Sequence, residues 1–169
     1  MELHVINQPN DELLKKHARW AVEADLALAK SEFQWLVKDH LEVGMDEWLK
    51  DLSDFKKQEG ELIDSIGFDE KANVGTWILL AISNGEPVGM TRIVVWDTQE
   101  IWSLNSIYVD PKQRGKGIGF AMVDKVKRTA LEFGGKQIQL SVYIRNVRAQ
   151  NLYKKLGFVP YMSDMACSL

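Results

Sequence analysis

Hydrophobic residues recur at helical spacing through the first third of the chain. A short apolar run at residues 3–6 predicts a first strand, and the cap and acidic residues at 9–12 predict the start of a helix. Apolar positions then repeat every three or four residues as far as Leu41. A further helix is expected from Asp46 to Gly60, with Gly60 ending it, and the acidic segment 61–71 is interpreted as a short helix or an ordered loop.

The middle of the chain changes to the composition of β-strands. Residues 76–83 and 87–96 are apolar, β-branched runs joined by Asn84-Gly85, the dipeptide that favours a type I′ hairpin turn. Gly89, inside the second run, indicates a bulge or a close backbone approach. A third run at 101–109 completes three successive antiparallel strands, an order that disfavours a doubly wound fold.

The last third returns to mixed elements. A helix is predicted over 120–133, a strand over 138–142, and a helix over 145–156 that Gly157 ends at its C′ position. Two short terminal strands are predicted at 158–160 and 165–169. No repeat or linker interrupts the chain, so residues 1–169 are predicted to form a single domain of the α/β (α+β) class.

Composition narrows the class of protein further. Hydrophobic residues make up 46% and charged residues 27% of the 169 positions, which is typical of a soluble globular domain. No apolar run approaches the ~20 residues that a membrane helix needs, and the first residues lack the pattern of a signal peptide. The single cysteine, Cys167, excludes an internal disulfide and suits a reducing compartment, so a cytoplasmic location is expected.

The net charge of −3 hides an asymmetry along the chain. Residues 1–111 hold 10 Lys and Arg against 21 Asp and Glu, a balance of −11, whereas residues 112–169 hold 11 against 3, a balance of +8. A basic half suits a polyanionic ligand and an acidic half a cationic one, although two solvated faces of opposite sign are the alternative. The basic residues lack interleaved aromatic residues and any nucleic-acid-binding motif, so no nucleic-acid partner is expected.

A glycine-rich segment between the third strand and the following helix carries the first candidate chemistry. Its glycines alternate, and the amides at the start of a helix lack intrahelical partners and attract anions. The segment also carries three positive charges, on Lys112, Arg114 and Lys116. These features predict a phosphate-binding loop, with an ordinary helix entrance as the alternative.

The spacing selects among known phosphate loops. A Walker A loop requires Ser or Thr after Gly-Lys, but Gly117 follows Lys116, and a dinucleotide fingerprint requires a glycine where Phe120 stands. The pattern Arg-x-x-Gly-x-Gly, from Arg114 to Gly119 after Tyr-Val-Asp-Pro, resembles the pyrophosphate loop of the GNAT superfamily of acyl-CoA N-acyltransferases.

A second motif lies in the next predicted helix. Asn146-x-x-Ala149-x-x-Leu152-Tyr153-x-Lys155-x-Gly157-Phe158 resembles the other recurring GNAT signature. Asn146 and Tyr153 are seven residues apart, hence on one helix face, and the small Ala149 between them leaves room for an extended ligand. For Tyr153 alone, a packed ring with its hydroxyl at the rim is the alternative. Both motifs stand in the order and separation typical of the family, and the resemblance covers residue 76 to the C-terminus well and residues 1–75 loosely.

The resemblance implies a fold, a cofactor and site residues. The fold would be a central mixed, mostly antiparallel sheet flanked by helices, with a long helical insert after the first strand. Acetyl-CoA would be the co-substrate, and no metal is implied. Its pantetheine arm would pair with the backbone of Ile107, Tyr108 and Val109, and Asn146 would bind the same arm. Its pyrophosphate would lie on the amides of Arg114, Gly115, Lys116, Gly117, Ile118 and Gly119, and Tyr153 would protonate the leaving CoA thiolate as a general acid.

The reaction implied is direct attack of a primary amine on the thioester in a ternary complex. An aliphatic ammonium has a pKa around 10, so a group must take its proton. Many relatives carry a glutamate where this chain has Asn105, so the base stays unassigned. Either a water relay reaches another carboxylate, of which Asp97 and Glu100 are the nearest in sequence, or the amine binds already neutral. Histidines His4, His17 and His40 are interpreted as structural or exposed.

Three hypotheses about the function remain open. A small-molecule amine is favoured, a protein lysine or N-terminus is the alternative, and a CoA-binding module without turnover is a third hypothesis, supported only by the missing glutamate. Members of this family often form homodimers, although no stretch of this chain marks an interface.

Overall fold

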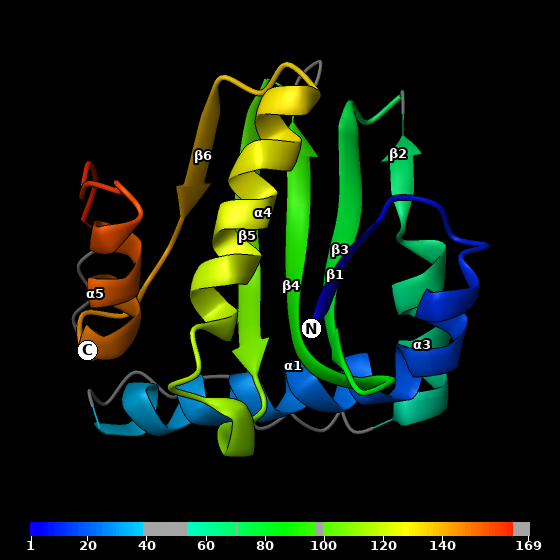
Figure 1. Ribbon diagram of the computed structural model, residues 1–169, viewed down its shortest axis with the longest axis horizontal. Helices are drawn as coiled ribbons and strands as arrows, with labels where there is room; N and C mark the ends of the chain where they lie inside the picture. Colours follow the sequence, from blue (N-terminus) through cyan, green and yellow to red (C-terminus); the bar gives the residue numbers. More distant parts are fainter. Residues whose placement is uncertain (39–53, 70, 97–99, 164–169) are drawn as a thin grey trace, which may run out of the picture.

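A mixed sheet with helices on both faces forms the protein (Figure 1), as seen in a computed structural model. The structure describes residues 1–38, 54–69, 71–96 and 100–163, and for residues 33–38 it describes the backbone alone. The elements in chain order are β1 (Glu2–Ile6), α1 (Glu12–Lys38), α3 (Phe55–Asp64), β2 (Gly67–Asp69), β3 (Val74–Ser83), β4 (Glu86–Trp96), β5 (Ile101–Val109), the 3₁₀ turn η1 (Pro111–Gln113), α4 (Ile118–Glu132), β6 (Gln137–Leu140) and α5 (Val147–Lys155).

The sheet has the order β1-β3-β4-β5-β6, with β2 pairing beside β1 on β3. All of these pairings are antiparallel except the last, because β6 follows a helical crossover and runs parallel to β5. The predicted mixed, mostly antiparallel sheet and the three successive antiparallel strands are therefore confirmed.

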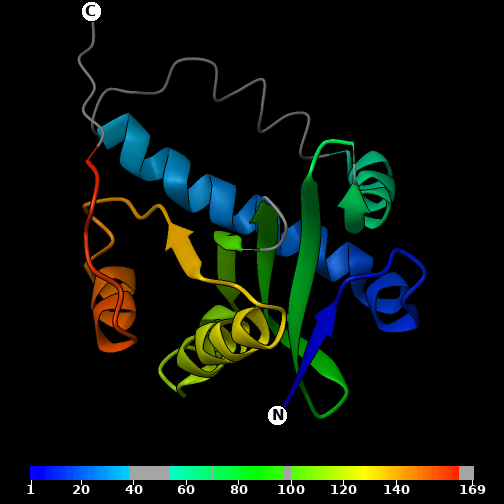
Figure 2. The ribbon, with the colours of Figure 1, turned by 90° about the horizontal axis from the view of Figure 1, so that it is seen from above.

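Strand β3 separates two cores by the alternation of its side chains. Its odd-numbered residues, such as Trp77 and Leu79, join the core beneath α4. Its even-numbered residues, such as Ile78 and Leu80, join the core beneath α1 and α3. Seen from above, α1 and α4 lie on opposite faces of the sheet (Figure 2). Burial on both faces explains why this strand reads as a continuous apolar run.

The turns confirm the local predictions for the hairpin. Asn84 and Gly85 both have positive φ, at 54° and 80°, as a type I′ turn requires. The register between β3 and β4 slips beside Gly89, which leaves Val88 as an extra residue in β4. A Cβ at Gly89 would lie 2.7 Å from the sulfur of Met122, so the predicted close approach is there as well, against α4.

Helix α1 begins where the cap residues predicted. Asp11 accepts hydrogen bonds from the N–H groups of Leu13 and Leu14, at 2.9 and 3.1 Å. The predicted end at Gly60 was wrong, because α3 runs through that glycine to Asp64. Packing offsets the ~1 kcal/mol that a helical glycine costs: Arg19 of α1 stacks on Phe55, and Leu62 is buried.

Three other predicted elements differ or lie outside the described residues. The segment 61–71 contains the short strand β2, which sequence patterning missed, because only three residues pair there. Residues 158–160 form no strand, so that prediction was wrong: Val159 is exposed, and the described chain beside it offers no ladder. The helix start at Asp46 and the strand at 165–169 lie outside the described residues.

Candidate functional site

The glycine loop joins η1 to α4 with its backbone N–H groups unpaired. Gly115 and Gly117 adopt left-handed φ values of 86° and 80°, and α4 begins directly afterwards with no side-chain cap. Within the described chain, the N–H groups of residues 115–119 donate to no acceptor. A Cβ at Gly115 or Gly117 would meet no atom within 4 Å. The loop therefore presents several donors at a helix N-terminus to open space, the arrangement that binds anionic phosphate.

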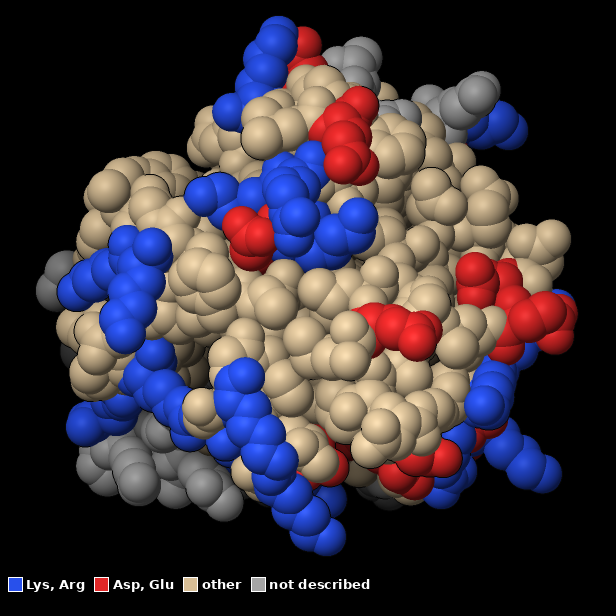
Figure 3. Space-filling view, viewed as in Figure 1, with Lys and Arg blue, Asp and Glu red and all other residues tan. Residues whose placement is uncertain are grey.

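Charged side chains hold the loop in place. The Nε of Arg114 donates to the carbonyl of Val109 at 2.9 Å, which ties the loop to the end of β5. The Nζ of Lys116 donates to Gln113 at 2.7 Å. On the face shown in Figure 3, Lys and Arg side chains gather around this loop and over α5. The predicted basic surroundings of the loop are thus present, and Arg114 has a structural contact besides its charge.

With respect to the described residues, strand β5 has a free edge beside this loop. It pairs with β6 only through residues 101–104, after which the two strands diverge (Figure 1). The N–H of Asp110 donates to the carbonyl of Val88, so alternate residues, Tyr108 among them, turn their polar backbone groups toward β4. Ile107 and Val109 turn theirs toward the free edge. An extended ligand could therefore pair with Ile107 and with the N–H of Val109, whose carbonyl already accepts from Arg114. The backbone of Tyr108 is engaged within the sheet.

Helix α5 lies across from the free edge of β5, where β5 and β6 diverge. The Nζ of Lys127 in α4 donates to the carbonyl of Leu156 at 2.6 Å, and Leu152 contacts the start of α4 next to Gly119. Tyr153 follows Leu152, packs against the core below α4, and meets Phe158 edge to face. Burial, and then the charge of Glu32, raise the pKa of Tyr153 to about 12. The hydroxyl therefore stays protonated at neutral pH and can donate a hydrogen bond.

Asn146 lies at a different position in its helix from the one predicted. It is the N-cap of α5 and not a residue of its first turn, and its side-chain oxygen accepts from the N–H of Ala149 at 3.1 Å. This capping uses the acceptor of the amide and leaves its NH₂ group for other partners. Gly157 has a φ of 86°, which confirms the predicted C′ residue.

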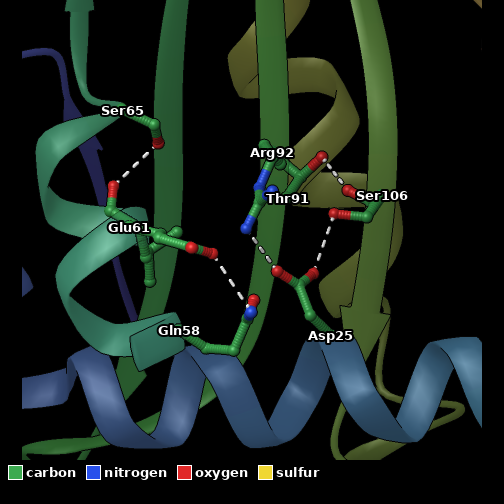
Figure 4. Close-up of polar contacts among 8 residues, drawn as sticks. Asp25, Gln58, Glu61, Ser65, Thr91, Arg92 and Ser106 are labelled. Carbon is green, nitrogen blue, oxygen red and sulfur yellow. Dashed lines mark hydrogen bonds and ion pairs between the residues drawn. The ribbon is translucent and has the colours of Figure 1, made fainter. Parts of the chain in front are cut away.

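A pocket of about 450 Å³ lies on the opposite side of β5, between α1, α3 and the sheet. Asp25 of α1 forms its floor with Arg92 of β4 and Ser106 of β5 (Figure 4). The Nη2 of Arg92 lies 2.6 Å from one oxygen of Asp25, and the hydroxyl of Ser106 lies 3.2 Å from the other. Burial is the largest influence on the pKa of Asp25, which is raised even though Arg92 and Ser106 oppose the shift.

Asn105 reaches this pocket through a bulge in β5. Arg92 is opposite Ser106 and Ile93 is opposite Leu104, so Asn105 is the extra residue between them. It is exposed and lines the pocket, and it stands where the free edge of β5 begins. The pocket and the free edge therefore meet at Asn105 and Ser106.

Glu32 lies on the same face of α1 as Asp25, two turns further along. It lines the pocket and is half-buried, and burial raises its pKa. Its charge also raises the pKa values of Tyr143 and Tyr153, in each case after the larger effect of burial. Glu32 is thus the carboxylate of the pocket that lies within electrostatic reach of Tyr153.

The carboxylates and histidines that sequence proximity suggested are elsewhere. Glu100 pairs with Lys136 before the first residue of β5. It is five residues from Asn105, which at the rise of a strand is about 17 Å. Asp97 and His40 lie outside the described residues. His17 is buried with a lowered pKa, mainly through burial, and His4 contacts Glu2.

Sequence reasoning missed the pocket residues Asp25, Glu32 and Arg92. The two acidic residues are seven apart on α1 and interrupt its apolar face, a signal that was available. Arg92 is a charge within an apolar strand. That α1 packs across β4 and β5 depends on the tertiary fold, and no local sequence pattern predicts it.

Two features are absent from the described residues. No helix among them is long and apolar enough to cross a membrane. No cluster of three or more His, Cys, Asp or Glu side chains is arranged there to hold a metal ion.

Comparisons with known proteins agree with this geometry. The model of the acetyltransferase (GNAT) family matches residues 33–158. The chain is 35% identical to bovine thialysine N-epsilon-acetyltransferase over 116 residues, which are 63% of this chain and 68% of the relative. It is 36% identical over 80 residues to an uncharacterized N-acetyltransferase of Methanocaldococcus jannaschii, covering 44% and 35% of the two chains.

Solved structures show the same fold. A mutant protein of Bacillus halodurans superposes with a TM-score of 0.71 at 13% identity, over the whole of both chains. PaiA N-acetyltransferase from Thermoplasma acidophilum, in complex with coenzyme A, gives 0.62 at 18% identity over 97% of this chain and 94% of the other. The phosphate loop, the diverging strands and the family match together establish that this chain belongs to the GNAT family of acetyltransferases.

Proposed function

We propose that this protein transfers an acetyl group from acetyl-CoA to the primary amine of a small molecule, by direct attack in a ternary complex. One observation carries the proposal: the free amides of the glycine loop, the free edge of β5 and the acid-lined pocket form one continuous path. The amides lie at residues 115–119, the edge includes Ile107 and Val109, and the pocket begins at Asn105. This path has a place for each part of both substrates.

The cofactor would lie along the first part of this path. Its pyrophosphate would accept hydrogen bonds from the amides of residues 115–119, and Lys116 would add charge. Its pantetheine amides would pair with Ile107 and Val109 as an added strand. The thioester would then lie near Asn105, at the mouth of the pocket.

The pocket favours a small cationic acceptor. Carboxylates from α1 and α3 line it, among them Asp25, Glu32 and Glu61. Helix α3 covers one side of it (Figure 4), which suits a compact molecule better than a polypeptide passing through. The bovine relative is named for acetylating the ε-nitrogen of thialysine, an amine of this size.

Tyr153 would assist the leaving group. Its pKa of about 12 keeps a proton on the hydroxyl, whereas an ordinary thiol has a pKa of about 8.5. Complete transfer of the proton from this hydroxyl to the thiolate would be thermodynamically unfavourable by itself. The hydroxyl would therefore first donate a hydrogen bond to the sulfur as the C–S bond breaks, and give up its proton as the nitrogen supplies another.

Release of CoA thiol across an amine panel tests the proposal. The panel contains thialysine, lysine, a polyamine and a lysine-containing peptide, each with acetyl-CoA and the full chain. We expect turnover with at least one of the small amines and much slower turnover with the peptide. Preference for the peptide would replace the small acceptor by a protein. Cofactor binding by calorimetry without thiol release from any amine would indicate a CoA-binding module.

A further inference from the structure

We propose that Glu32 removes the proton from the acceptor ammonium. This inference rests on the proposed function and adds a residue to it. Asn105 cannot take that proton, because an amide is not a base near neutral pH. We therefore place the proton acceptor on another element around the pocket.

The position of Glu32 fits the role. It is seven residues after Asp25, on the face of α1 that lines the pocket, with the small Ala29 between them. It is also the pocket carboxylate whose charge reaches both Tyr143 and Tyr153, beyond the free edge of β5. An amine that attacks a thioester lying between the pocket and Tyr153 would have Glu32 beside it.

The other described carboxylates of the pocket are engaged. Asp25 holds Arg92 and Ser106, so protonating it would break an ion pair. Glu61 accepts a hydrogen bond from Gln58 at 3.1 Å and lies 3.7 Å from Lys57, on the α3 side. Glu32 makes no hydrogen bond or ion pair with any residue that the structure describes. Among the described residues of the pocket, it is therefore the carboxylate that can accept a proton without breaking a polar contact to another described residue.

The surroundings of Glu32 suit a base. Burial raises its pKa above that of an exposed carboxyl, which makes it a stronger proton acceptor. The charged groups that line the same pocket are Asp25 from its own helix, Glu61 from α3 and Arg92 from β4. Beyond the free edge of β5, the hydroxyls of Tyr143 and Tyr153 are the titratable groups that the charge of Glu32 reaches.

Proton uptake by Glu32 would also prepare Tyr153. The negative charge of Glu32 is one cause of the raised pKa of Tyr153. Once Glu32 is protonated, that cause disappears and the hydroxyl becomes a better acid when the thiolate leaves. The N–C bond forms as the C–S bond breaks. Of the two protons that the ammonium loses, one passes through Glu32 to solvent and the other replaces the proton that Tyr153 gives to sulfur.

The kinetic test compares Glu32→Gln with wild type across pH, using the best amine of the panel. We expect kcat/KM to fall by about 10²–10⁴-fold at neutral pH, and to rise with pH in the variant as the free amine accumulates. The loss should largely disappear with trifluoroethylamine, which is already neutral at pH 7. Acetyl-CoA affinity by calorimetry should be unchanged. A loss of the same size for the neutral amine would overturn the role of Glu32 as a base.

Controls separate this inference from the proposed function. Glu23→Gln removes an exposed carboxylate of α1 that pairs with Arg19 and should keep wild-type activity. Glu61→Gln tests the rival carboxylate and should lose far less than Glu32→Gln. If the wild type releases no thiol with any amine, the proposed function is contradicted. If the wild type is active and Glu32→Gln is equally active, only this inference is contradicted.

A readout without turnover completes the test. Ultraviolet difference titration reports tyrosine ionisation in the protein without substrate, and subtraction of Tyr153→Phe isolates the signal of Tyr153. We expect Glu32→Gln to lower the pKa of Tyr153, because the neighbouring negative charge is gone. An unchanged titration would show that the two groups do not communicate and would count against the proposal.

Discussion

Arg92 and Asp25, 67 residues apart in the sequence, form an ion pair of 2.6 Å between β4 and α1. The side chains are only 34% and 18% exposed, and the pair lies beside the bulge that contains Asn105. It fixes the pocket-lining face of α1 relative to the sheet. Together with the apolar core between α1 and the sheet, this pair and Ser106 therefore help to hold the pocket and the free edge of β5 in one geometry.

Asp25→Ala should destabilise the fold, because it leaves the guanidinium of Arg92 without its partner. We expect a loss of about 1–3 kcal/mol in the free energy of unfolding, measured by urea denaturation. The matched control is Asp124→Ala, which breaks the exposed pair with Arg128 and should cost about 0.5 kcal/mol or less. Equal losses in the two variants would show that the buried pair has no special role.

Tyr153→Phe should lower turnover by about 10²–10⁴-fold, the usual contribution of a general acid. Acetyl-CoA affinity should change little, because the ring and its contact with Phe158 remain. Initial rates of thiol release and calorimetry with acetyl-CoA measure the two quantities. Tyr161→Phe, which removes an exposed hydroxyl bonded to Gln139, is the control. A parallel loss of rate and affinity would contradict the assignment of Tyr153 as the acid.

Gly117→Val should weaken acetyl-CoA binding at least tenfold in calorimetry. The space above Gly117 is open, and a branched side chain would fill the place proposed for the phosphates. The substitution also strains the backbone at a residue whose φ is 80°. A control must therefore separate the effect of this strain on folding from a direct effect on binding. Gly134→Val provides it, because Gly134 has a φ of 79° and open space at the opposite end of α4. Similar affinities in the two variants would argue against a phosphate at Gly117.

Local chemistry explains which parts of the fold sequence alone predicted. The Asn84-Gly85 turn, the cap at Asp11 and the C′ glycine at Gly157 each depend on residues adjacent in sequence, and each was found as expected. The helix end at Gly60 was wrong because tertiary packing of α3 on α1 outweighed a local preference. The expected strand at 158–160 was wrong because, among the described residues, its apolar side chains have no neighbouring strand to join.

The residues of the candidate site also fall into two groups, those predicted from local sequence motifs and those that only the fold brings together. The loop at 114–119 and Tyr153 were predicted as site residues from contiguous motifs. The loop has free amides and Tyr153 has a raised pKa, and their roles stay predictions. Asp25, Glu32 and Arg92 come from two elements that meet only in the folded chain. A pattern along one helix could not show that its acidic residues face the bulge at Asn105.

Ionisation of the Glu32 side chain should lower the free energy of unfolding at neutral pH. Its pKa is raised in the folded state, so the unfolded chain loses this proton at a lower pH than the folded one. Stability is therefore lost as pH rises from the unfolded pKa to the folded pKa, and the loss persists at neutral pH. Glu32→Gln should be more stable than wild type in urea at pH 7 and show no such gain below about pH 4. The same difference at both pH values would contradict an ionisation effect.

Asn105→Glu should restore activity to Glu32→Gln. Asn105 is exposed and reaches the pocket from the bulge, so a glutamate there would place a carboxylate at the mouth of the proposed acceptor site. We expect the double variant to regain at least about tenfold in kcat/KM over Glu32→Gln, part of the contribution of a general base. Asn105→Gln in the same background matches the length without the charge and should regain nothing. Recovery with glutamine as well as glutamate would mean that the longer side chain acts by packing, and proton removal at this edge of β5 would then need another explanation.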